Sequence, residues 1–167
     1  MQVISVANEL ETRLEQARTH QGDDLAALLH DPNPEVLASL LANPHLQETH
    51  IRMLVHRADV PAIILESIAR EPRWIRSEPV RLGLVQHPHT PRLDALTLLR
   101  QLFVFHLVRV CMHPAAPPEV RRVAEELLAE RASQLPTAGK LTLARRGLLV
   151  LLERCSRKAI VMSSHWC

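Results

Sequence analysis

The chain has 167 residues, 47% of them hydrophobic, so it is long enough to bury the core of a single domain. Only four glycines and no tyrosine favour helices and leave few residues suited to strands. Twenty basic and 18 acidic residues give a net charge of +2, which excludes a global field that gathers polyanions, and no apolar run approaches the ~20 residues of a membrane span.

Residues 1–30 predict capping helices at the N-terminal end. Leu10, Leu14 and Ala17 follow helical spacing with charged residues between them, and Gly22 ends the segment. A short helix through Leu25 and its neighbours follows, until two prolines interrupt it. We then expect residues 31–155 to form helical repeats, the first of which begins with Asn33 as cap and Pro34 as first helical residue.

The stretch VRLGLVQHPHTPRLDALTLLRQ, residues 80–101, predicts two helices joined at a corner. Pro88 stops the first helix near His87, because proline lacks an N–H and restricts the residue before it. Thr90 is then the expected cap, and Pro91 the expected first residue, of the second helix. The same order of features occurs earlier in the chain.

Sliding the sequence by 44 positions aligns this corner with an earlier one. The six matched pairs are Val36 with Val80, Leu40 with Leu84, Leu41 with Val85, Pro44 with Pro88, His45 with His89, and Leu54 with Leu98. A second alignment, at 42 positions, places Pro72 on Pro114. Such intervals are typical of HEAT or armadillo-type units of ~40–47 residues. We therefore predict an all-α single domain, a right-handed α-solenoid of HEAT-like repeats of about 42–44 residues.

The segment HPHTPRLDALTLL, from His87, resembles the proline corners of bacterial HEAT-like and leucine-rich repeat variant proteins. The resemblance covers about residues 31–130. It implies a helical-repeat fold and a scaffold role. Repeats of the variant family are shorter than 42–44 residues, and the cysteine group that holds an iron–sulfur cluster in its founding example has no counterpart here, so we expect no cofactor.

Several later segments carry predictions of their own. Trp74 is expected to pack as a wedge between units, with a ligand platform as the alternative. The apolar run from Leu102 to Met112 predicts a buried helix, and Val120, Ala124 and Leu128 mark the next one. Residues 156–167 lack the repeat pattern and predict a frayed tail or incomplete repeat. The array would then end in an unsealed C-terminal edge, which would self-associate.

Neither catalysis nor metal binding is predicted. Ten histidines include a pair at His87 and His89, but corners of helices 8–10 Å apart cannot share a zinc ion whose bonds to nitrogen are ~2.0–2.1 Å long. No phosphate loop, nucleophile elbow or zinc-protease motif is present. Three widely spaced cysteines and the lack of a leader predict a cytoplasmic protein with reduced thiols.

The leading hypothesis is therefore a non-catalytic scaffold that binds a protein or peptide in its groove. The expected contact residues are Arg52, His56, Trp74, Arg92 and Arg100. The alternative is binding of a nucleic-acid backbone through an arginine-rich face. That face would comprise Arg70, Arg73, Arg76, Arg81, Arg121, Arg122, Arg145 and Arg146.

Overall fold

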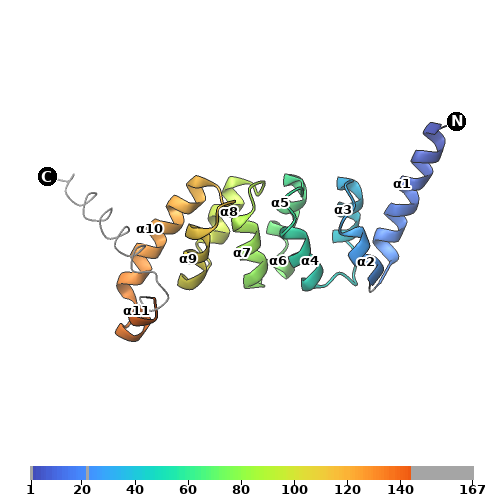
Figure 1. Ribbon diagram of the computed structural model, residues 1–167. Coiled ribbons are helices and arrows are strands. Elements are labelled where there is room, and N and C mark those ends of the chain that lie inside the picture. The colour runs from blue at the N-terminus through green and yellow to red at the C-terminus, as the bar shows by residue number, and fades with distance from the viewer. Residues whose placement is uncertain (1, 22, 144–167) are drawn as a thin grey trace.

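The computed structural model describes residues 2–21 and 23–143, and every regular element within these ranges is a helix. The helices lie side by side in one elongated body, with α1 at one end and α10 and α11 at the other (Figure 1). No helix in the described ranges is long and apolar enough to cross a membrane. The all-helical class predicted from composition is confirmed.

The helices pack in two rows along the body. One row consists of α1 (Gln2–Thr19), α3 (Pro34–Leu41), α5 (Ala62–Arg70), α8 (Arg92–Leu99) and α10 (Pro118–Gln134). The other consists of α4 (Glu48–Val55), α7 (Glu78–Gln86) and α9 (Val104–Met112). Three short helices complete the chain: α2 (Asp23–Leu28), α6 (Pro72–Ile75) and α11 (Thr137–Leu143). The buried leucine, isoleucine and valine side chains of both rows meet between them and form one core.

The corners after α3 and α7 use the same hydrogen-bonding device. Asn43 is 1% exposed; its amide nitrogen donates to the carbonyls of Ala17 and His20 at 2.9 and 3.1 Å, and its oxygen accepts the N–H of His45. At the later corner, His87 Nε2 lies 2.6 Å from the carbonyl of Arg57, and Nδ1 accepts the N–H of His89. Each side chain therefore closes its own turn and also caps the end of an earlier helix.

The interval of 42–44 residues predicted from the sequence is not the interval between successive helices of one row. Helices α3, α5, α8 and α10 begin at residues 34, 62, 92 and 118, which gives intervals of 28, 30 and 26. The alignment at 44 places α3 on α7, and these helices belong to opposite rows. Both corners carry the same proline device, so the sequence match reflects turn chemistry and not an equivalent position in the body.

Two local predictions are also wrong, while two are confirmed. Helix α8 begins at Arg92, and the buried Thr90 hydroxyl has no hydrogen-bond partner, so it does not cap the helix. Helix α9 is not buried on all sides, because Phe103 and Met112 are each 67% exposed. Asn33 does cap α3, with its side chain accepting the N–H of Glu35. The stripe of α10 is buried as predicted.

A close approach of α7 to α4 gives a test of this packing. A β-carbon at Gly83 would lie 2.6 Å from Cγ2 of Val55, too close for any unstrained contact. We expect Gly83→Ala to lower the free energy of unfolding by about 1–3 kcal/mol, as overpacking does. Gly139→Ala in α11 is the matched control, because its β-carbon would meet nothing nearer than 3.5 Å. Urea unfolding followed by circular dichroism would measure both, and an unchanged midpoint for Gly83→Ala would contradict the packing.

The corner at His87 predicts a pH dependence of stability. A carbonyl can only accept, so Nε2 of His87 carries the proton, and Nδ1 must stay unprotonated to accept the N–H of His89. Burial lowers the pKa of His87 below its usual 6.5. The unfolded chain therefore binds this proton first, and the unfolding free energy should fall as pH drops below about 6.5, levelling off below the folded pKa.

His87→Asn is the control, since asparagine makes the equivalent bonds at residue 43 without titrating. Urea midpoints measured from pH 8 to pH 5 should fall more steeply for the wild type than for this variant. Equal slopes for the two proteins would contradict the assigned role of His87.

Candidate functional site

Helix α4 lies near the middle of the body and presents one free face. Its buried side chains, Ile51, Leu54 and Val55, share one stripe at helical spacing, and the helix packs against α7. Its other face carries Thr49, Arg52, Met53 and His56, all exposed. The spacing of apolar residues thus fixes which side of α4 is available to a partner.

Two hollows adjoin this face and share two residues. The larger, of about 660 Å³, is lined by Gln21, Ala26, Pro44, His45, Leu46, Gln47, Thr49, His50, Met53 and Arg73. The smaller, of about 410 Å³, is lined by Thr49, Arg52, Met53 and His56. We call these lining residues together the α4 surface. Both volumes lie in the range of about 300–1,000 Å³ usual for ligand sites.

Polar contacts hold the walls of the larger hollow in place. Nε2 of Gln21 lies 3.0 Å from Nε2 of His45, which ties the end of α1 to the corner after α3. Nδ1 of His50 accepts the backbone N–H of Gln47 at 3.1 Å. The proton of neutral His50 is therefore on Nε2, which makes no hydrogen bond within the described residues. This ring edge remains available as a donor.

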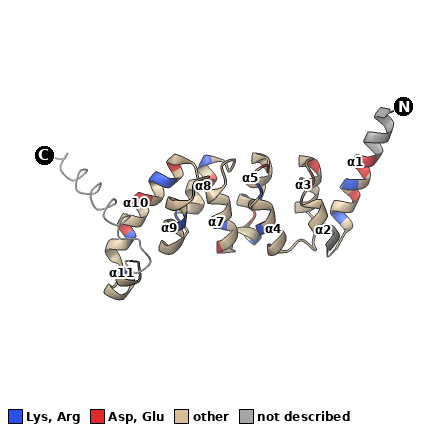
Figure 2. Cartoon of the chain, viewed as in Figure 1, with Lys and Arg blue, Asp and Glu red and all other residues tan. Residues whose placement is uncertain are grey.

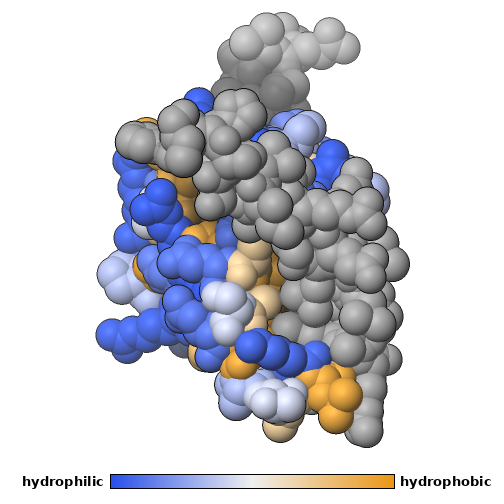
Figure 3. All heavy atoms as spheres, turned by 90° about the vertical axis from the view of Figure 1, so that its left-hand side faces the viewer, coloured by the Kyte–Doolittle hydropathy of each residue, from blue (hydrophilic) through white to orange (hydrophobic). Residues whose placement is uncertain are grey.

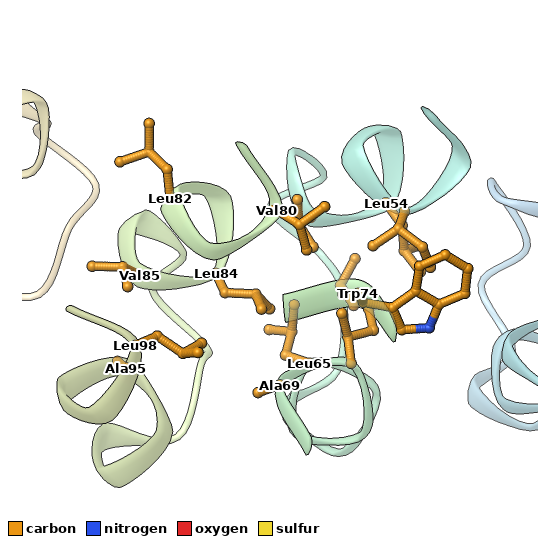
Figure 4. Close-up of a cluster of buried hydrophobic side chains, with 14 of the residues drawn as sticks. Leu54, Leu65, Ala69, Trp74, Val80, Leu82, Leu84, Val85, Ala95 and Leu98 are labelled. Carbon is orange, nitrogen blue, oxygen red and sulfur yellow. The ribbon is translucent and has the colours of Figure 1, made fainter. Parts of the chain in front are cut away.

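Arg73 is anchored beneath the same hollow. Its guanidinium donates to the carbonyl of Leu46 and stacks over the indole of Trp74, with Cζ 4.2 Å from the ring centroid. Trp74 itself is 5% exposed and lies against the core close to Leu54 and Leu65 (Figure 4). Trp74 is therefore a core residue and not an exposed contact residue, while its role as a wedge between repeat units stays a prediction.

The remaining predicted contact residues do not form one surface. Arg52 and His56 lie together on α4, where Nδ1 of His56 is 2.6 Å from the Arg52 carbonyl. Arg92 and Arg100 lie at the two ends of α8, in the opposite row, and Arg92 pairs with Glu119 of α10. The α4 surface thus contains two of the five predicted residues. Its His45 and His50 were not predicted as contact residues, and Arg73 was predicted only for the nucleic-acid face. His45 and Arg73 come from separate segments that only the fold brings to α4.

The arginines proposed for nucleic acid are spread over α5, α6, α7 and α10. Arg70 pairs with Glu66 and Arg122 pairs with Glu126, whereas Arg73 contacts a carbonyl and an indole and forms no ion pair within the described residues. Basic and acidic residues are interspersed along the described helices (Figure 2). Arg145 and Arg146 lie outside the described residues, as does the tail of residues 156–167 expected to form an unsealed edge.

The end of the body formed by α10 and α11 differs in character from the α4 surface. Its described part is hydrophilic over much of one side, with hydrophobic residues between the polar ones (Figure 3).

The described residues contain no group of three or more histidine, cysteine, aspartate or glutamate side chains placed to hold a metal ion. Comparison with protein-family models, curated proteins and solved structures finds no match to the chain.

The burial of Trp74 predicts that its removal affects stability. We expect Trp74→Ala to lower the free energy of unfolding by about 3–5 kcal/mol, because it leaves a large cavity in the core. Met53→Ala, at a side chain 45% exposed, should cost less than about 0.5 kcal/mol. Denaturant titrations of the two variants would compare them, and a mild effect of Trp74→Ala would favour the ligand-platform interpretation.

Proposed function

We propose that this chain is a non-catalytic scaffold, a right-handed α-solenoid of HEAT-like repeats that binds a peptide or protein segment on the α4 surface. The observation that carries the proposal is the pair of adjoining hollows, which share Thr49 and Met53 on the exposed face of one central helix. The two hollows adjoin at these shared residues, and both are open rather than enclosed. An extended segment fits such a shape better than a compact metabolite does.

The arrangement of the helices supports the solenoid. Helices of each row pack on the next member of the same row, as stacked repeats do. Side-chain hydrogen bonds between one helix pair and the preceding one recur at sequence separations of 23 to 31 residues. This spacing favours units of two helices and 26–30 residues, shorter than the 42–44 residues expected from the corner alignment.

Nucleic-acid binding is the alternative function, and the charges support it less well. Two of the arginines that would face phosphates, Arg70 and Arg122, are already paired with glutamates on their own helix. Neutralising the phosphates of a nucleic-acid backbone requires many unpaired cationic side chains on one face of the protein. A partner held by a few contacts on α4 needs only the cations found there.

Met53 provides the test, because it is an exposed apolar side chain shared by both hollows. Peptides selected against the full chain from a random display library should lose at least tenfold in affinity for Met53→Asp, about 1.4 kcal/mol. Leu93→Asp is the matched control, since Leu93 is 79% exposed on α8, in the other row. Isothermal titration calorimetry would compare the two variants.

Two results would count against the proposal. The first is a selection that yields no binder. The second is a set of selected peptides that tolerate Met53→Asp and lose affinity for Leu93→Asp, which would place the contact on the opposite row. Thermal unfolding of both variants should match that of the wild type, so that a loss of binding is not a loss of fold.

A further inference from the structure

Charges on the α4 surface point to the chemistry of its partner. No aspartate or glutamate is among the described residues that line the two hollows, whereas Arg73 lines the larger and Arg52 the smaller. Thr49 and Met53 lie where the two hollows meet. Each hollow therefore has one guanidinium in its lining, and the exposed apolar side chain of Met53 is shared by both.

Neither guanidinium is neutralised by a carboxylate within the described residues. Arg52 makes no ion pair there and is exposed. Arg73 is occupied by a neutral carbonyl and an aromatic ring, and both partners leave its charge in place. By contrast, Arg13, Arg57, Arg70, Arg92 and Arg122 each pair with an acidic side chain. The two arginines of the α4 surface are therefore free to meet carboxylates from outside.

The acidic side chain of α4, Glu48, binds a residue outside the α4 surface. Glu48 precedes Arg52 by one helical turn, and its Oε1 accepts the hydroxyl of Ser77 at 2.7 Å. This contact directs the carboxylate toward the corner that leads into α7. Nε2 of His50 adds a further donor to the larger hollow. Donors thus dominate the polar groups of the surface.

We infer that the partner is an acidic peptide segment in which carboxylates flank an apolar side chain. The apolar side chain would cover Met53, and the carboxylates would meet Arg52 and Arg73. Arginine is well suited to this role, because its planar guanidinium can bind a carboxylate through two parallel hydrogen bonds. The inference rests on the proposed function and adds the sign of the partner's charge.

The experiment uses peptides selected from the display library against the full chain. Selected sequences should contain aspartate or glutamate on both sides of an apolar residue. Replacing those acids by asparagine and glutamine should weaken binding about tenfold or more. Arg52→Gln should weaken the acidic peptide similarly but have little effect on the amide version, because the charged pair is then already broken. Arg109→Gln, at an exposed arginine of α9, is the matched control.

The outcomes separate this inference from the function on which it rests. Neutral peptides that still require Met53 would leave the binding function standing and overturn the acidic partner. Peptides insensitive to Met53→Asp would overturn both. A short DNA duplex that binds as tightly as the acidic peptide, displaces it and loses affinity for the Arg52→Gln variant would identify the partner as a nucleic acid and overturn the peptide assignment. Acidic peptides that need both Met53 and Arg52, and resist the duplex, would support the assignment.

Discussion

The structure depends on one recurring interaction, in which a side chain from one helix pair caps the C-terminal carbonyls of a helix in the pair before it. Asn43 does so for α1, Arg57 for α2 and Arg131 for α8, and His87 makes the corresponding contact to the Arg57 carbonyl just after α4. The last carbonyls of a helix have no partner within it, and a buried carbonyl without a donor costs ~1–3 kcal/mol. Helices of six to nine residues would be marginal alone, so this capping links their stability to their neighbours.

The chemistry of the cap varies while its geometry is kept. The amide of Asn43, the imidazole of His87 and the guanidinium groups of Arg57 and Arg131 all donate an N–H to a carbonyl. The first three residues lie in corners, and Arg131 lies on α10. Asparagine and histidine also offer an acceptor, so they can close their own turn after the proline at the same time. Arginine cannot accept a hydrogen bond, and Arg57 instead pairs with Asp59.

This variety explains what the sequence could and could not predict. Prolines and helical spacing located the corners, the cap at Asn33 and the stripe of α10, because these depend on residues close together in the chain. The two rows could not be predicted, since corners in both rows carry the same proline device. The exposure of Phe103 and Met112 depends on which neighbours lie beside α9, which an unbroken apolar run does not reveal.

The candidate site was predictable only where it lies on a single helix. Arg52 and His56 follow a corner on the side of α4 opposite its apolar stripe, so periodicity alone identified them as exposed. The other wall combines Gln21, His45 and Arg73, which are separated by 24 to 52 positions and meet because the capping contacts place successive corners side by side. A prediction of this wall would have required knowing which helices share a row, and the alignment of the proline corners pairs helices of opposite rows.

Similar contacts also hold the elements of the α4 surface against their neighbours. Glu48 at the start of α4 binds Ser77, the carbonyl of Arg57 just after its end binds His87, and Leu46 in the preceding corner binds Arg73. A partner that docks here meets a surface already ordered, so little conformational entropy is lost on binding. Arg73 shows the connection most directly, because the indole that orients its guanidinium belongs to the core. The contacts that hold Arg73 in place are therefore part of the packing of the core.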